Sequence, residues 1–427
     1  MEVKLYNLNI NGLNTLLIPM EKTDIVSAGM FIKVGSINET KDNNGIAHFL
    51  EHLMFKSTIK RPNKTLLNFL DNLGTNYNAG TSKDHTYYEI NGNKDDIDQI
   101  IDVIIDLYTN PVYEVDEVEL EKGVILEELK MYQDTITRTL FDYIISELFK
   151  GTPLAPSTIG TEEIIKKITI DDVTNFRKLY TLENSLLVIA GNFKKNDVIE
   201  SVKKHSKNCN FNRSTIEEPN INYTITTTKP NIYIIPNKSL NQSYLFISFY
   251  FNKITSFQEV ILKFLSDYMS SGSTSKLFEV LRNKLGSSYS NETDFMTYRG
   301  ENGLFYIYCN INNLLMLESI KEILIIINNL KTTDISNEDI KKVKKIFETS
   351  NLFQINNPNY NMLYHGKKYL FGKQVNILEE IDNIEKIDAK IIRDFSNELF
   401  IKKNLSIFIF GNDINQSDLA KIVNEFN

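Results

Sequence analysis

The sequence is poor in the features that would place it in several other classes of protein. Its 427 residues include two cysteines, Cys209 and Cys309, which cannot build a disulfide framework and favour a reducing compartment. No apolar run approaches the roughly 18 residues that a membrane-spanning helix needs, and residues 1–12 have neither a signal-peptide core nor an Arg-rich transit segment. The net charge of −8, without a basic stripe, argues against nucleic-acid binding. We therefore expect a cytoplasmic protein with no membrane or nucleic-acid partner.

The chain is too long for a single hydrophobic core. At 427 residues and 42% hydrophobic content, it should form two domains of about two hundred residues each. A polar stretch that contains Pro219 and Pro230 predicts a linker at 209–230, between domains at 1–208 and 231–427. Short strands and helices occur in runs, not in strict alternation. This pattern predicts an α+β fold with mostly antiparallel sheets packed with helices.

An internal repeat divides the chain into two similar halves. Residues 184–192, NSLLVIAGN, recur at 404–412 as NLSIFIFGN, an offset of 220. A weaker match pairs the Leu-Gly at 73–74 with the Leu-Gly at 285–286, and each is expected to end an amphipathic helix with a glycine cap before a strand. We therefore expect two homologous halves.

The stretch His48-Phe49-Leu50-Glu51-His52 carries the most chemical information. On a helix of about 100° per residue, His52 lies about 40° from His48 and Glu51 about 60° to the other side, so all three share one face. Two imidazoles one turn apart can share a Zn²⁺, and a neighbouring carboxylate can take a proton from a metal-bound water. The pattern is the inverted form of the H-E-x-x-H zinc-protease motif.

The same three residues could instead lie on the solvated surface of a helix. Their neighbours argue against that reading. The motif is surrounded by apolar residues, namely Ile46, Phe49, Leu50, Leu53, Met54 and Phe55. Two histidines and a glutamate in such a setting need partners, because burying them unpaired costs free energy. We therefore favour a metal site.

A catalytic zinc site normally has three protein ligands plus water, so a third ligand is expected elsewhere. The segment from Asp116 to about Lys150 has the apolar spacing of a long helix and carries Glu121, Glu127 and Glu128. Glu121 and Glu128 are seven residues apart and point the same way, whereas Glu127 lies about 100° off and should be solvated. Spacing alone does not choose the ligand.

Three runs of the sequence together resemble the pitrilysin/insulinase family of zinc peptidases: GIAHFLEHLMFKST, GTNYNAGTSKDHTYYEI and EKGVILEELKMY. The resemblance is to the branch of short subunits that includes the mitochondrial processing peptidase. It implies one Zn²⁺ per chain, held by His48, His52 and Glu128, with Glu121 supporting the site from beside the ligands. One departure is Ser57, where the family usually has glycine; it lies in the turn after the motif helix and not among the ligands.

The resemblance also implies substrate contacts. Asn78 and Ala79, in GTNYNAGTS, match an edge strand against which substrate backbone lies. Arg282 and Tyr289, in SSGSTSKLFEVLRNKLGSSYS, match a pair that binds substrate carbonyl groups. Without the resemblance, Asn78 would be an ordinary turn or strand-end residue, Arg282 a solvated helix residue and Tyr289 a strand aromatic.

The predicted function is a zinc-dependent endopeptidase that hydrolyses extended peptides or presequences inside an enclosed chamber, as the family implies. Glu51 is expected to be the general base, and Tyr289 to help stabilise the oxyanion. The alternatives are a catalytically silent structural subunit and a subunit that needs a different partner chain. Because this chain supplies two repeats whereas the long single-chain relatives have four, we expect a homodimer.

Overall fold

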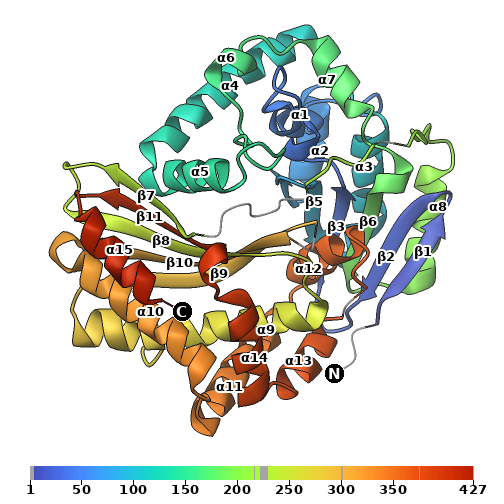
Figure 1. Cartoon of the computed structure of the whole chain (residues 1–427). Helices are drawn as coiled ribbons and strands as arrows, with labels where there is room; N and C mark the ends of the chain where they lie inside the picture. The colour runs from blue at the N-terminus through green and yellow to red at the C-terminus, as the bar shows by residue number, and fades with distance from the viewer. Residues whose placement is uncertain (1–3, 216, 222–228, 300–301, 375, 427) are drawn as a thin grey trace. The chain divides into compact units, whose positions relative to one another are not determined.

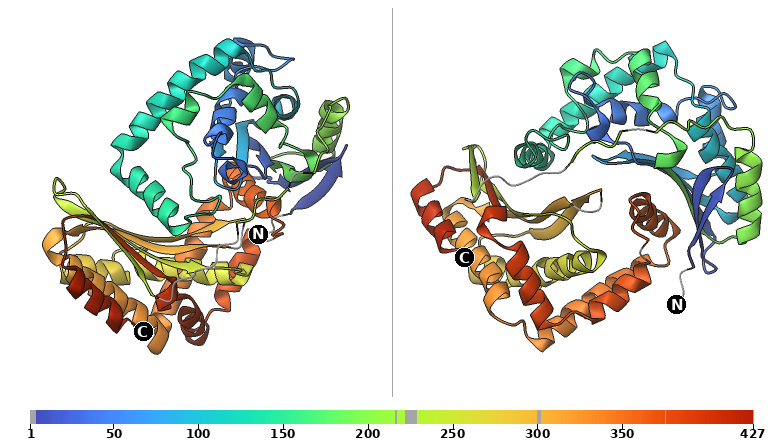
Figure 2. Two further views of the ribbon diagram at one scale, coloured as in Figure 1. Left: turned by 45° about the horizontal axis from the view of Figure 1, so that its top comes forward. Right: turned by 45° about the vertical axis from the view of Figure 1, so that its right-hand side comes forward.

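The computed structural model describes residues 4–215, 217–221, 229–299, 302–374 and 376–426 (Figure 1). The chain forms two compact units. The first comprises residues 1–223 and 353–376, and the second comprises residues 224–352 and 377–427. Figure 2 shows the sheet and helices of each unit from two further sides.

The first unit is built on a six-stranded sheet. In sheet order its strands are β1 (Tyr6–Ile10), β2 (Leu13–Pro19), β6 (Ser185–Gly191), β3 (Ile25–Ile32), β5 (Thr86–Asn93) and β4 (Asn76–Thr81). Neighbouring strands are antiparallel except β2 and β6. Strand β4 forms one edge of the sheet, so one side of its backbone has no partner strand in the described unit.

Helices cover both faces of this sheet. They are α1 (Ile46–Met54), α2 (Lys64–Asn72), α3 (Ile97–Thr109), α4 (Val115–Asp134), α5 (Ile136–Leu148), α6 (Glu162–Ile165), α7 (Ile170–Arg177), α8 (Lys195–Ser206) and α12 (Pro358–Leu370). The main core packs α1, α3 and α7 against one face of the sheet. Helix α12 packs against β3 and β6 on the other face, over a separate apolar cluster of Leu16, Ile18, Phe31, Leu186, Val188, Ala190 and Met362.

Two glycines allow α12 to approach the sheet closely. A Cβ on Gly29 would lie 2.1 Å from Met362 Sδ, and a Cβ on Gly366 would lie 2.4 Å from the ring of Phe31. The predicted extent of the second domain, 231–427, is therefore wrong for residues 353–376, which return to the first unit because α12 buries apolar side chains there.

The predicted linker at 209–230 falls partly inside the first unit. The backbone N–H of Leu182 donates to the carbonyl of Asn212, and Ile221 is buried. Residues 222–228 lie outside the described residues. The start of this stretch is thus held by the fold, because its backbone and apolar side chains find partners there.

The second unit is built on a five-stranded sheet. In sheet order its strands are β7 (Asn231–Pro236), β11 (Leu405–Gly411), β8 (Gln242–Phe251), β10 (Asn302–Asn312) and β9 (Asn291–Tyr298). Its helices are α9 (Ser256–Ser270), the π-helix η4 (Phe278–Lys284), α10 (Met316–Thr332), α13 (Ile377–Glu385), α14 (Ala389–Leu399) and α15 (Gln416–Glu425), and α11 (Asn337–Gln354) begins in this unit. None of the helices in the described ranges is both long and apolar enough to span a membrane.

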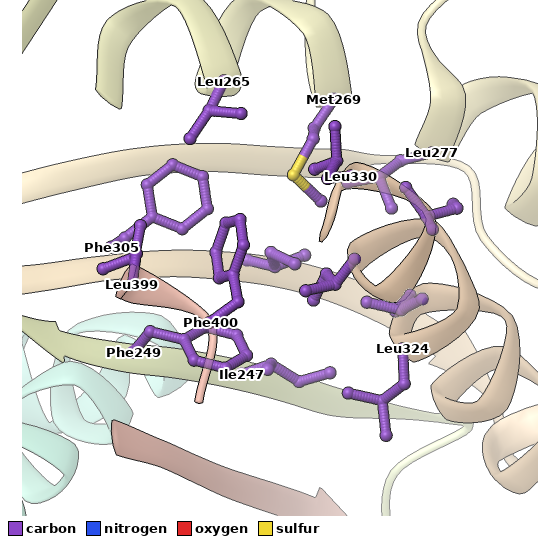
Figure 3. Packing of buried hydrophobic residues seen from close by; sticks show 14 of the residues in the cluster. Ile247, Phe249, Leu265, Met269, Leu277, Phe305, Leu324, Leu330, Leu399 and Phe400 are labelled. Carbon is purple, nitrogen blue, oxygen red and sulfur yellow. The ribbon is translucent and has the colours of Figure 1, made fainter. Parts of the chain in front are cut away.

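Aromatic rings fill the centre of the second unit's core. The ring of Phe400 lies 4.8 Å from that of Phe249 and 5.5 Å from that of Phe305, both edge to face (Figure 3). Leu265 and Met269 of α9 pack into the same cluster. Edge-to-face contacts of this kind add to the free energy gained from burial.

The two halves share one topology. In each half a parallel strand pair (β2–β6 and β7–β11) is followed across the sheet by three antiparallel pairings. Strands β6 and β11 are offset by the predicted 220 residues. Gly74 and Gly286 both adopt left-handed backbone conformations, with φ of 61° and 63°. The predicted α+β fold with two homologous halves is confirmed.

The single helix expected from Asp116 to about Lys150 is in fact two helices, α4 and α5. Thr135 interrupts them with an extended backbone, φ −95° and ψ 98°. Its hydroxyl donates to the carbonyl of Met131, and the hydroxyl of Thr139 donates to the carbonyls of Tyr132 and Gln133. These threonines satisfy the last carbonyls of α4, so side-chain hydrogen bonds replace the next helical turn.

Candidate metal centre

The N-terminus of helix α1 has a backbone conformation that favours glycine and is capped by the half-buried carboxylate of Glu39. Gly45 has φ 95°, and a Cβ there would lie 2.8 Å from the carbonyl of Ile159. Glu39 accepts hydrogen bonds from the backbone N–H groups of Gly45 and Ala47, each at 2.9 Å, and from the side chain of Asn44 at 2.8 Å. A carboxylate that pairs the free N–H groups of a helix N-terminus stabilises it. These contacts therefore hold the N-terminus of α1 in place, just ahead of His48 in the sequence.

Packing of α1 against α4 brings the motif to the third predicted ligand. The Nε2 atoms of His48 and His52 lie 3.3 Å apart. Glu128 Oε2 lies 3.3 Å from His52 Nε2 and 3.7 Å from His48 Nε2. Within the described part of the chain, these three residues form the one group of His, Cys, Asp or Glu donors close enough to share a metal ion.

The spacing of the three donor atoms fits zinc. Zinc–nitrogen and zinc–oxygen bonds of about 2.0–2.2 Å in a tetrahedron place neighbouring ligand atoms about 3.3–3.6 Å apart. The three observed separations are 3.3, 3.3 and 3.7 Å. Two imidazoles and one carboxylate are also a donor set that zinc accepts in catalytic sites.

Glu121 supports the site from the neighbouring turns of α4. It is buried, its Oε1 lies 2.8 Å from His52 Nδ1 and its Oε2 lies 2.6 Å from Lys56 Nζ. Burial raises the pKa of Glu121, but the hydrogen bonds from His52 and Lys56 outweigh burial and hold this pKa below its ordinary value. Once His52 loses its second proton to a metal, donation from Nδ1 to Glu121 would leave its Nε2 lone pair free to bind that metal.

Glu127 lies outside this arrangement, as the helical spacing predicts. Its side chain is 72% exposed and pairs with Lys130, one turn away on the same helix. The helix therefore directs Glu121 and Glu128 inward and Glu127 to solvent.

The two histidines have opposite charge preferences without a metal. Burial, and then the charge of His52, lower the pKa of His48 to about 4. Burial would also lower the pKa of His52, but hydrogen bonds with Glu121 and Glu128 raise it to about 9. Near neutral pH His48 is therefore neutral and His52 is positively charged. A metal must displace the extra proton of His52 before His52 can bind it.

Glu51 lies beside the triangle of donors that His48, His52 and Glu128 form (the donor triangle), and it contacts the end of β4. The hydroxyl of Thr81 donates to Glu51 Oε2 at 2.6 Å. Burial raises the pKa of Glu51, against the lowering effect of the Thr81 hydrogen bond. A carboxylate whose pKa is raised toward neutrality suits proton transfer near pH 7.

Asn78 and Ala79 lie side by side in edge strand β4 but present different groups. The N–H of Ser82 donates to the carbonyl of His85 on the inner side of this hairpin. Since backbone groups alternate along an antiparallel strand, Asn78 directs its N–H and C=O toward β5, while Ala79 directs them toward the open edge. Ala79 can therefore pair with an added strand through its backbone, and Asn78 offers only its exposed side chain.

Arg282 and Tyr289 are brought together in the second unit. The Arg282 guanidinium lies 4.7 Å from the Tyr289 ring centroid and 4.9 Å from that of Phe278. Tyr289 precedes β9 and is 78% exposed, so it is not a strand aromatic. Arg282 lies on η4, and π-helical turns are often found at functional sites.

Sequence reasoning missed three residues that shape the site, namely Glu39, Lys56 and Thr81. Lys56 lies four residues after His52, so helical spacing could have indicated it. Glu39 and Thr81 gave no local signal, because their contacts depend on how a loop and an edge strand meet α1.

Comparison with known proteins identifies the family models and the relatives that this chain resembles. Residues 15–162 match the family described as Insulinase (Peptidase family M16), and residues 167–347 match the Peptidase M16 inactive domain. An uncharacterized zinc protease of Rickettsia felis is 27% identical over 95% of this chain and 97% of its own length. The mitochondrial-processing peptidase subunit beta of Dictyostelium discoideum is 32% identical over 46% of this chain and 42% of its own. The crystal structure of a protease from Helicobacter pylori shares the fold, with a TM-score of 0.88 and 20% identity over 96% of this chain and all of that one.

Proposed function

Because the chain belongs to the insulinase family of peptidases, family M16, we propose that it is a zinc-dependent endopeptidase that hydrolyses extended peptides or presequences. One observation carries the proposal. The donor triangle of His48, His52 and Glu128 lies beside the carboxylate of Glu51. A structural zinc site is closed by a fourth protein ligand, whereas the described residues supply three donors and a base.

The roles of the residues follow from their contacts. His48, His52 and Glu128 would hold the zinc, and Glu121 would keep His52 in the ligating tautomer. Bound zinc supplies Lewis-acid chemistry, which lowers the pKa of water and polarises a carbonyl group. Glu51 would accept the proton of the attacking water and return it to the leaving amine.

Peptide substrates would bind as an added strand on β4. The backbone groups of Ala79 face the open edge and would pair with the peptide. Recognition through backbone hydrogen bonds requires an extended peptide and tolerates many sequences. Extended segments such as presequences meet this requirement, whereas folded proteins do not.

The experiment that tests the proposal is cleavage of an internally quenched peptide library by the purified chain with one equivalent of zinc. We expect cleavage that a chelator abolishes and zinc restores, with mass spectrometry locating the cut bonds. Absence of cleavage by the fully zinc-loaded chain would instead favour the alternative of a catalytically silent subunit. One observation that favours this alternative is the match of residues 167–347 to the domain described as inactive.

Arg282→Ala and Tyr289→Phe are expected to lower peptide turnover at least about tenfold while leaving the zinc content unchanged. The reason is that the stacked pair offers a guanidinium and a hydroxyl, both donors to carbonyl groups. Lys284→Ala is the control, since Lys284 is on the same π-helix but pairs with Glu322. Normal turnover in both variants would leave the pair with a structural role only.

We also propose that the active species is a homodimer that encloses a chamber. The described residues form two homologous halves and one donor triangle, so a second copy would bring four halves together around the substrate. Multi-angle light scattering should give about twice the chain mass of 49.3 kDa. A monomer at micromolar concentration with full specific activity would refute the dimer, and recovery of activity only with a different chain would identify a partner-dependent subunit.

A further inference from the structure

The last residue of the edge strand joins the proposed peptide-binding edge to the proposed base. We propose that Thr81 is a positioning residue that holds the Glu51 carboxylate at the open edge of β4, directly beyond the backbone groups of Ala79. This inference rests on the proposed peptidase function and specifies where along a bound peptide the base acts.

Thr81 contacts Glu51 through its side chain. Its hydroxyl donates to Glu51 Oε2 at 2.6 Å. An O–H···O⁻ bond of about 2.5–2.7 Å is a charge-assisted hydrogen bond, stronger than one between neutral groups. This bond from the last residue of β4 fixes the position of Glu51 Oε2. With Oε2 held, Oε1 is the oxygen left to take a proton from water.

The strand register places this contact on the peptide-binding side of β4. The backbone groups of Tyr77, Ala79 and Thr81 all face the open edge, because Ser82 pairs inward with His85. Thr81, one of these outward-facing residues, is the one whose hydroxyl donates to Glu51. A peptide added to β4 can therefore pair with Ala79 but meets the base at the next outward position, two residues further on.

That spacing sets a length scale for cleavage. Two residues of a strand cover about 7 Å, so the bond nearest Glu51 lies about two residues from the peptide backbone paired with Ala79. Because strand and base are linked through Thr81, a shift of the strand end would move the base with it. The position of the base relative to the peptide would then be kept by one hydroxyl group.

The test compares Thr81→Val with Thr81→Ser. Valine keeps the branched shape and the backbone N–H but removes the hydroxyl, so we expect kcat to fall about tenfold or more. KM should stay within about twofold, because the Ala79 pairing edge is unchanged, and the zinc per chain and melting temperature should match the wild type. Serine keeps the hydroxyl and should restore kcat to within about threefold.

Thr75→Val is the matched control. Thr75 directly precedes β4, and its hydroxyl donates to the carbonyl of Leu70, away from Glu51. This variant should keep wild-type kcat. Full activity in Thr81→Val, equal impairment in Thr81→Ser, a change confined to KM, or loss of zinc from Thr81→Val would each overturn the inference alone. A zinc-loaded wild-type chain that cleaves no peptide would overturn the proposed function and this inference with it.

Discussion

Glu51→Gln should abolish peptide hydrolysis while leaving zinc bound. Glutamine is nearly isosteric and can still accept the hydrogen bond of the Thr81 hydroxyl, so the local packing is kept. An amide cannot take a proton from water, and general-base catalysis typically contributes 10²–10⁴-fold. We expect kcat/KM to fall more than about 10²-fold, measured with a quenched peptide, at an unchanged zinc content.

Glu127→Gln provides the comparison for this result. It makes the same chemical change at an exposed glutamate of α4 that pairs with Lys130, and it should have wild-type activity. If Glu51→Gln kept activity within tenfold of the wild type, the base would have to be another group. If it lost zinc, Glu51 would be a ligand and not the base.

Glu128→Gln should release zinc, whereas Glu127→Gln should not. The two residues are neighbours on α4, yet only Glu128 reaches the histidines, with Oε2 at 3.3 Å from His52 Nε2. Zinc binding at structural sites with four protein ligands is worth about 10–16 kcal/mol, or several kcal/mol per ligand, so losing one of the three protein ligands here should weaken binding by at least about 10²-fold. Zinc per chain, measured after dialysis against graded chelator, gives the comparison.

Glu121→Gln should fall between these two variants. Glu121 touches the metal site only through His52, and outer hydrogen bonds of this kind typically change metal affinity 10–100-fold. Equal zinc retention by Glu128→Gln and Glu127→Gln would show that the third ligand lies elsewhere. Weaker retention by Glu121→Gln than by Glu128→Gln would exchange the roles assigned to these two glutamates.

Local periodicity predicted the part of the site that one helix carries. His48, Glu51 and His52 share a face because helical spacing is set within a few residues. Spacing within α4 excluded Glu127 but left Glu121 and Glu128 equivalent, because the choice depends on how α4 packs against α1. Thr81 could not be found in this way, since its contact joins an edge strand to a helix 30 positions away in the sequence.

The fold, like the site, has features that local sequence patterns predict and features that depend on contacts between distant residues. Repeated strand patterns predicted two homologous α+β halves, because both copies keep their apolar strands and glycine caps. The break at Thr135 was missed because the spacing of apolar residues carries no information about hydroxyl–carbonyl hydrogen bonds. These bonds compete with the hydrogen bonds of the helix. The return of α12 was missed because it depends on the close fit at Gly29 and Gly366, far apart in the chain.

The late position of α12 has a consequence during synthesis on the ribosome. About 150 residues separate the main part of the first unit from the end of the segment that covers its second sheet face. At about 5–20 residues per second, a nascent chain would expose the apolar cluster around Phe31 and Val188 for roughly 8–30 s. A fragment that stops near residue 223 would keep the motif helix yet leave this face bare. Such a fragment should aggregate or recruit chaperones, and adding residues 353–376 as a separate peptide should rescue its solubility.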